Sequence, residues 1–218
     1  MSNFDAVVFD MDGTILDTLA DIGESMNRVL VSFGFPPHPL DAYRYFVGEG
    51  SPVLVEKALP ANARTPAMIQ DCLKAYQQDY GANWQVHTRL YEGISEMLDA
   101  LAARNIRMTI LSNKYHSFTL QCHEHFFRSW PFDVVLGIRD GVPRKPDPAA
   151  AFEIARKLQL PPSRFFYVGD TGVDMQTAVS AGMFPVGVLW GFRTQEELVA
   201  NGARFLAEHP RDIVEKFL

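Results

Sequence analysis

The chain has 218 residues, a formal net charge of −6 and 47% hydrophobic residues, which suits one large domain or two smaller ones with a buried core. There is no basic cluster, so nucleic acid is not an expected partner. No apolar run reaches the roughly 18 residues of a membrane span, and we expect no signal peptide. Cys72 and Cys122 lie far apart in the sequence, so we expect buried thiols and a cytoplasmic protein.

The first strong pattern is an apolar run that ends in acidic residues. Ala6–Phe9 predicts a strand that is buried on both faces, and Asp10, Asp12, Gly13 and Thr14 follow it closely. In open α/β sheets, ligands bind at the carboxyl ends of the strands. Folding alone gives no reason for two acids at this position, so the pattern indicates chemistry.

The next part of the chain, residues 15–88, predicts helices and no strand. Apolar residues three and four apart indicate an amphipathic helix that starts at Leu16 and closes at Gly34. Ser51-Pro52 predicts an N-cap and first helical position for a second helix. Thr65-Pro66 opens a further helix, which we expect to end at Gly81.

Strands and helices alternate after this helical insertion. Strand-like segments are predicted at residues 107–111, 134–136, 165–168 and 186–189. Thr194 and Glu197 predict a capping box for the helix that follows. Alternating elements imply right-handed crossovers and a doubly wound parallel sheet, so the fold class is α/β. We assign residues 1–14 and 90–218 to the core and residues 15–89 to the insertion.

Polar residues follow several of the predicted strands. Because the strands of a parallel sheet end at one edge, we expect these residues to form one site, together with a lysine from a nearby loop. The set consists of Asp10, Asp12, Ser112, Asn113, Lys145, Asp170 and Asp174.

Four carboxylates beside one ammonium group require a cation. Two like charges at about 4 Å repel by about 4 kcal/mol at an effective dielectric of about 20. Carboxylate oxygens suit Mg²⁺, which also binds phosphate oxygens. Asp10 can then attack phosphorus to give an aspartyl-phosphate, while Asp12 protonates the leaving alcohol and later activates water. The Ser112 hydroxyl, backbone N–H groups and Lys145 would hold the phosphoryl oxygens.

These motifs resemble the haloacid dehalogenase superfamily of phosphatases. Four of them match in order: Asp10-Met11-Asp12-Gly13-Thr14, Leu111-Ser112-Asn113, Lys145-Pro146, and Gly169-Asp170 with Asp174. The resemblance implies a Rossmann-like core, and it implies that the inserted helices form an α-helical cap domain.

The same resemblance implies roles for individual residues. Asp10 would be the nucleophile, Asp12 the general acid and base, and Lys145 a further catalytic residue. Mg²⁺ would be bound by Asp10, by the main-chain carbonyl of Asp12 and by Asp170, with Asp174 as a further ligand or the partner of one. The phosphate-binding set would be Gly13, Thr14, Ser112, Asn113 and Lys145.

Within the superfamily the chain is most similar to phosphoglycolate phosphatases. The similar stretches are Phe46-Val47-Gly48-Glu49-Gly50, Ser112-Asn113-Lys114 and Val188-Leu189-Trp190-Gly191-Phe192. The family more often has Asn at the position of Glu49 and Pro at that of Tyr115. Arg44, Glu49 and Gly50 are the cap residues that we consider as candidates for contact with substrate.

Related functions use similar residues. A sugar phosphomutase would form the same aspartyl-phosphate and pass it to another hydroxyl group. A signalling receiver domain also places an Asp, a hydroxyl, a Lys and acids around Mg²⁺, but it needs neither Asp12 nor a large insertion. A dehalogenase should lack Asp12 and Asp170. We therefore predict a Mg²⁺-dependent phosphatase for a small phosphorylated metabolite, acting as a monomer or a homodimer.

Overall fold

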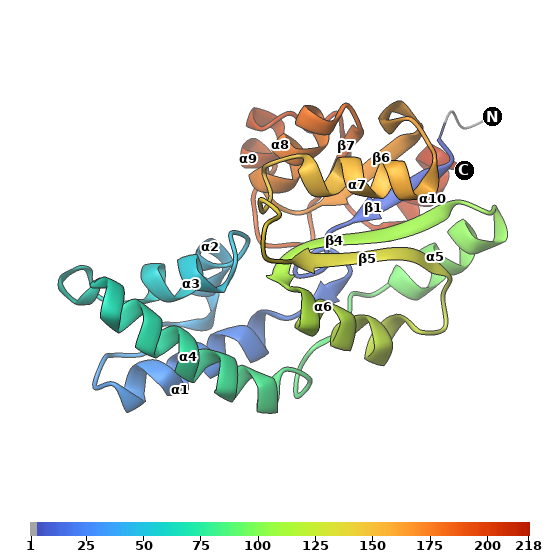
Figure 1. Ribbon diagram of the computed structural model, residues 1–218. Coiled ribbons are helices and arrows are strands. Elements are labelled where there is room, and N and C mark those ends of the chain that lie inside the picture. The colour runs from blue at the N-terminus through green and yellow to red at the C-terminus, as the bar shows by residue number, and fades with distance from the viewer. Residues whose placement is uncertain (1–3) are drawn as a thin grey trace. The chain divides into compact units, whose positions relative to one another are not determined.

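The computed structural model describes residues 4–218 and divides into two compact units (Figure 1). One unit takes in the chain up to Leu16 together with Leu90–Leu218, and the other is Asp17–Arg89. Within the described residues, no helix is both long enough and apolar enough to cross a membrane.

The first unit is built on a six-stranded sheet with the order β5-β4-β1-β6-β7-β8. All neighbouring strands in it are parallel. Because β1 lies between β4 and β6, the chain extends the sheet first to one side of β1 and then to the other. This is the doubly wound arrangement that the sequence predicts, and that prediction is confirmed. The strands are β1 (Ala6–Phe9), β4 (Arg107–Tyr115), β5 (Phe132–Ile138), β6 (Phe165–Gly169), β7 (Phe184–Val188) and β8 (Phe205–Ala207).

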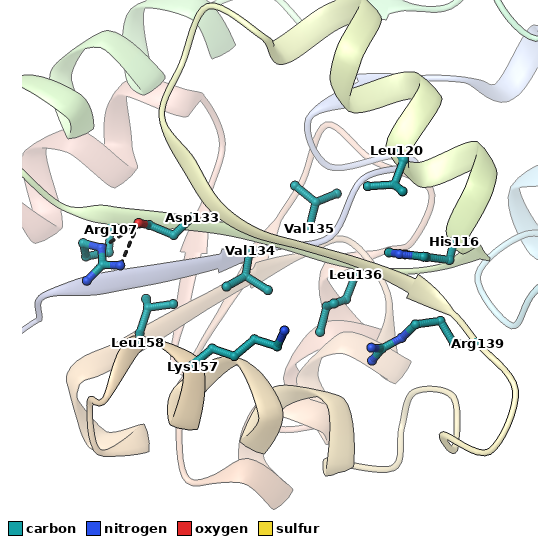
Figure 2. Close-up of a pocket in the computed structure, with 10 residues that line it drawn as sticks. All are labelled: Arg107, His116, Leu120, Asp133, Val134, Val135, Leu136, Arg139, Lys157 and Leu158. Carbon is teal, nitrogen blue, oxygen red and sulfur yellow. Dashed lines mark hydrogen bonds and ion pairs between the residues drawn. The ribbon is translucent and has the colours of Figure 1, made fainter.

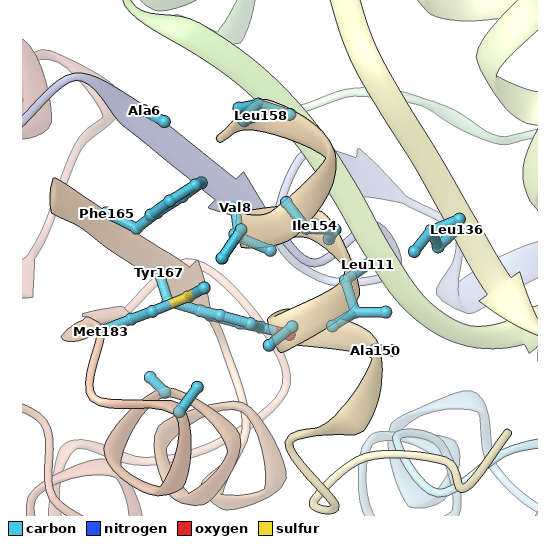
Figure 3. Packing of buried hydrophobic residues seen from close by; sticks show 14 residues of the cluster. Ala6, Val8, Leu111, Leu136, Ala150, Ile154, Leu158, Phe165, Tyr167 and Met183 are labelled. Carbon is cyan, nitrogen blue, oxygen red and sulfur yellow. The ribbon is translucent and has the colours of Figure 1, made fainter. Parts of the chain in front are cut away.

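Helices cover both faces of this sheet. On one face, Val8 and Tyr167 belong to the same buried cluster as Ile154 of α7 (Figure 3). On the other face, Phe166 stacks on Phe217 of α10 with ring centroids 4.5 Å apart. Successive residues of a strand point to opposite faces, so alternate apolar residues of β6 pack against the helices on either side of the sheet. The helices are α5 (Ile94–Ala103), α6 (His116–Cys122), α7 (Ala149–Leu158), α8 (Gly172–Ala181), α9 (Gln195–Ala200) and α10 (Pro210–Phe217).

The second unit is mainly helical. It contains α1 (Leu19–Ser32), α2 (Tyr43–Phe46), α3 (Ser51–Ala58) and α4 (Pro66–Asn83). Helices α1 and α4 pack together, and Arg28 of α1 donates to Asp79 of α4 at 2.6 Å. Asp21 of α1 accepts the backbone N–H groups of His87 and Thr88, which ties the end of the unit to its first helix.

Short segments complete the two units. A two-stranded sheet pairs β2 (Leu16–Asp17) with β3 (Arg89–Leu90). The 3₁₀ helices are η1 (Leu40–Ala42), η2 (Ala61–Ala63) and η4 (Pro162–Arg164), and η3 (His123–Phe127) is a π-helical turn. Cys72 and Cys122 are both buried free thiols, as expected from the sequence.

Several predicted boundaries in the helical insertion are wrong. The insertion is not strand-free, because Leu16–Asp17 pairs with Arg89–Leu90 in a two-stranded sheet, and helix α1 begins only at Leu19. Ser51 is the first residue of α3, and Gly50 is its N-cap. Helix α4 continues through Gly81 to Asn83, since a glycine inside a helix weakens it without necessarily ending it.

The α/β core also differs from the prediction in three places. Ser112 and Asn113 lie within β4 instead of after it, because β4 pairs with β5 again at Tyr115 after a register irregularity beyond Leu111. Thr194 caps α9 by accepting the Glu197 N–H, but the Glu197 carboxylate accepts the Gly172 N–H, so the two do not form a capping box. Strand β8 and helix α10 follow the last strand that the sequence predicts.

Candidate active site

Three aspartates meet at the carboxyl ends of neighbouring strands. Asp10 follows β1, Asp170 follows β6, and Asp174 lies in the first turn of α8. One carboxylate oxygen from each lies within 4.8 Å of the other two, and all three residues are buried. Strands β1 and β6 are adjacent in the sheet, so the parallel register brings Asp10 and Asp170 together.

Lys145 provides the positive charge inside this cluster. Its Nζ lies 2.9 Å from Asp10 Oδ1 and 2.7 Å from Asp174 Oδ1, and it donates to the carbonyl of Leu111 at 3.0 Å. The side chain of Asn113 holds the lysine's main chain, since its Nδ2 donates to the Lys145 carbonyl and its Oδ1 accepts the Lys145 N–H. The predicted phosphate-binding residue Asn113 therefore positions Lys145 in this structure.

Asp170 is held through both of its carboxylate oxygens. Thr14 Oγ1 donates to Oδ1 at 2.9 Å, and the Phe192 backbone N–H donates to Oδ2 at 2.8 Å. Gly13 has a φ of +88°, and a Cβ at that position would lie 2.3 Å from Asp170 Oδ2. Only glycine fits here, because the backbone is left-handed and passes directly against the carboxylate. Phe192 bonds to Asp170 through its backbone N–H, so the identity of its side chain could not reveal this contact in the sequence.

Asp174 is held from its own helix. Thr171 donates to Asp174 Oδ2 from its backbone N–H at 3.1 Å and from Oγ1 at 2.6 Å. In return, the Thr171 hydroxyl accepts the Asp174 N–H, so the two residues form the capping box of α8. Asp174 thus completes the capping box at the N-terminus of α8 and is also one of the three acids of the cluster.

Asp12 lies apart from the three-aspartate cluster. Its Oδ2 is 3.0 Å from Nζ of Lys114, and its Oδ1 is buried with no hydrogen-bond partner among residues 4–218. Lys114 is buried, and its backbone N–H donates to the Ser112 hydroxyl at 3.1 Å. Sequence reasoning did not select Lys114, although it directly follows the Ser112-Asn113 pair.

The cluster is short of positive charge. Burial and the nearby Asp174 raise the pKa of Asp10 well above its ordinary value. Burial and Asp174 also raise the pKa of Asp170 to about 7, despite the hydrogen bonds from Phe192 and Thr14. For Lys145, burial lowers the pKa, but Asp10 and Asp174 outweigh it and raise the pKa well above its ordinary value. A divalent cation would supply the missing charge, and three carboxylates match the oxygen ligands that Mg²⁺ takes.

The candidate cap residues belong to the second unit. Arg44 of α2 lies 3.6 Å from Asp41, and Glu49 forms an ion pair with Lys57 at 2.8 Å. Gly50 has a φ of +90°, a conformation that favours glycine, and it is the N-cap of α3.

A separate hollow of about 380 Å³ lies along β5 and contains none of the predicted site residues (Figure 2). Val134 and Leu136 point toward α7 on one side of β5, and Val135 points toward Leu120 of α6 on the other. The arginines at its rim are neutralised, Arg107 by Asp133 and Arg139 by Glu153. The two arginines that line it are thus paired with acids, in contrast to the unbalanced charge of the aspartate cluster.

Comparisons with known proteins agree with this geometry. Residues 7–188 match the family model of haloacid dehalogenase-like hydrolases. A phosphoglycolate phosphatase of Rhodobacter capsulatus is 33% identical over 92% of this chain and 91% of its own length. One of Pseudomonas putida is 30% identical over 96% of this chain and 75% of its own length.

Solved structures give the same result. The crystal structure of a candidate phosphoglycolate phosphatase from Lactobacillus delbrueckii subsp. bulgaricus superposes with a TM-score of 0.93 at 28% identity, covering 100% of this chain and 99% of that one. The match of the family model over most of the chain, together with these relatives, shows that the protein belongs to the haloacid dehalogenase-like hydrolase family.

Proposed function

We propose that the protein is a Mg²⁺-dependent phosphatase that hydrolyses a small phosphate monoester through an aspartyl-phosphate on Asp10. The observation that carries the proposal is the contact of Asp10 with Lys145 inside a buried cluster of three aspartates that is short of positive charge. The names of the relatives make phosphoglycolate the first substrate to test.

Mg²⁺ would be held by Asp10, Asp170 and the main-chain carbonyl of Asp12, with Asp174 as a further ligand or a partner of one. When bound, it would supply the positive charge that lets a phosphate group approach these carboxylates. Lys145 would add charge beside the phosphoryl oxygens, with the Ser112 hydroxyl as a further donor.

The protein's own residues can carry both steps of the reaction. A carboxylate oxygen of Asp10 forms a bond to phosphorus, and the bond from phosphorus to the ester oxygen breaks with its electron pair on that oxygen. Asp12 gives this oxygen a proton, and the alcohol leaves. Water then attacks phosphorus and gives a proton to Asp12, and the electron pair of the breaking phosphorus–oxygen bond returns to Asp10.

We also propose that residues 15–89 act as the cap of the α/β core formed by residues 1–14 and 90–218. In this proposal Arg44, Glu49 and Gly50 select the leaving group. Support comes from the division of the chain into two compact units close to these boundaries and from the positive φ values of Gly48 and Gly50.

The test is phosphate release from a panel of phosphate esters that includes phosphoglycolate and hexose phosphates. We expect turnover with Mg²⁺ and none in excess chelator. We expect Ca²⁺ to bind and inhibit, because its higher coordination number allows both oxygens of Asp10 to be bound. Full activity in chelator would contradict the proposal, and transfer of phosphate between hydroxyl groups of a sugar would instead indicate a mutase.

A further inference from the structure

We infer that Lys114 is a positioning residue for Asp12, which it holds so that one carboxylate oxygen stays available for proton exchange with the leaving group and with water. The inference rests on the proposed function, and it assigns a role to a residue outside the motif set. Lys114 Nζ contacts Asp12 Oδ2 at 3.0 Å, while Asp12 Oδ1 is buried and has no hydrogen-bond partner in the described chain.

Both side chains of the pair are largely shielded from solvent. The Lys114 side chain is 6% exposed and the Asp12 side chain 12% exposed, so solvent screens their attraction little. A buried oxygen without a partner is rare in a folded protein and calls for an explanation. Asp12 has one oxygen bound by an ammonium group and one left over, which suits a group that must exchange protons with a ligand.

The length of β4 places Lys114 at this position. The strand continues past Ser112 to Tyr115 with a register irregularity between Leu111 and Tyr115, and within this stretch the Lys114 backbone N–H donates to the Ser112 hydroxyl at 3.1 Å. The Lys114 carbonyl is fixed as well, because Thr119 Oγ1 donates to it at 3.3 Å. A Cβ on Gly137 of the neighbouring strand would come within 2.6 Å of this carbonyl oxygen, so β5 packs directly against this part of the chain.

Two buried lysines therefore contact different aspartates. Lys145 contacts Asp10 and Asp174, the groups around phosphorus. Lys114 contacts Asp12, the group proposed to act on the ester oxygen. If both served only to bind phosphate, loss of either would weaken all phosphate ligands equally. The positioning role instead predicts a loss that depends on the leaving group.

The test compares Lys114→Met with wild type on p-nitrophenyl phosphate and on an alkyl phosphate such as phosphoglycolate, with Mg²⁺ present. The p-nitrophenolate group leaves without a proton, so kcat/KM for that ester should change little. For the alkyl ester, kcat/KM should fall about 10- to 100-fold, because a misplaced acid loses effectiveness steeply. With p-nitrophenyl phosphate, kcat should fall and a burst of p-nitrophenolate should appear, since breakdown of the aspartyl-phosphate also needs Asp12.

Three comparisons separate positioning from a general structural effect. Inhibition by inorganic phosphate should be unchanged in Lys114→Met, and Lys114→Arg should recover part of the loss. Asp12→Asn should slow the alkyl ester by about 10²- to 10⁴-fold, and adding Lys114→Met to it should cause little further loss. The matched control is Lys157→Met, which removes an exposed lysine 3.6 Å from Glu153 and should leave the kinetics unchanged.

Equal losses of kcat/KM on both esters with weaker phosphate inhibition would overturn the inference and make Lys114 a phosphate-binding residue. Additive losses in the double variant would also overturn it. If Lys114→Met does not fold, Lys114→Gln is expected to give the same pattern. If wild type hydrolyses no ester, the proposed function fails, and crystal structures decide this inference: the Asp12 side chain should leave its position in the Lys114 variant, and an unmoved Asp12 would contradict positioning.

Discussion

Asp10 is the proposed nucleophile, and it is also one of the three buried carboxylates in the cluster that is short of positive charge. Asp10→Asn keeps the shape of the side chain and removes the proposed nucleophile, so phosphate release should fall to background. The variant should fold as well as wild type, because it also removes one carboxylate from a cluster short of positive charge. Turnover by the purified protein and thermal unfolding in chelator measure the two effects. Substantial turnover would show that Asp10 is not the nucleophile.

Asp170 allows a test of metal binding that does not depend on turnover. A ligand at about 100 times its Kd stabilises the folded protein by about 2.7 kcal/mol, so Mg²⁺ should raise the unfolding temperature of wild type. Asp170→Asn should lose most of this rise, because a carboxylate oxygen of the site becomes part of a neutral amide. Asp133→Asn, on strand β5 outside the cluster, is the control and should keep the rise. An undiminished rise in Asp170→Asn would place the ion elsewhere.

At the scale of elements, helices α1 and α4 are joined by the ion pair of Arg28 and Asp79. Burial raises the pKa of Asp79, but the charge of Arg28 and the hydrogen bonds from Arg28, Ser25 and Asn83 together outweigh it and leave that pKa below its ordinary value. A depressed carboxyl pKa stabilises the fold above the unfolded value of about 4, and this stabilisation is lost as the pH falls through the folded value.

Asp79→Asn should therefore lower the free energy of unfolding by about 0.5 kcal/mol at neutral pH, a small amount because Arg28 is partly exposed. The difference from wild type should shrink as the pH is lowered from about 5 toward 3. Urea unfolding monitored by circular dichroism measures both values. A difference that stays constant with pH would mean that the ion pair is not its source.

At the scale of the whole molecule, the proposed function assigns phosphate chemistry to the α/β unit and the choice of substrate to the helical unit. In the proposed function the core residues would contact the group that every phosphate ester shares, so they could not select the alcohol. Glu49→Gln and Arg44→Met should therefore change the ratio of kcat/KM between two esters by more than they change inhibition by phosphate. Glu56→Gln, an exposed neighbour on α3, is the control. Equal losses on both esters would assign selection to another part of the chain.

Sequence alone determined the type of most elements and the positions of the principal acids. The apolar run Ala6–Phe9 and the strand that ends at Gly169 are local patterns, and a parallel sheet necessarily brings their ends together. For this reason Asp10, Asp170 and Asp174 could be grouped before any coordinates were known. The helical insertion was likewise visible in its periodicity, although residues 16–17 form a strand.

The tertiary structure decided which partners these residues have. Strand β4 pairs with β5 again at Tyr115 after a register irregularity beyond Leu111, and Lys114 lies in this stretch beside Asp12. Asn113 holds the main chain of Lys145, and Thr14 donates to Asp170, although the sequence pattern assigned both to phosphate. Local periodicity sets the kind of element that forms. Contacts between segments far apart in the chain depend instead on strand register and side-chain packing, which no local pattern contains.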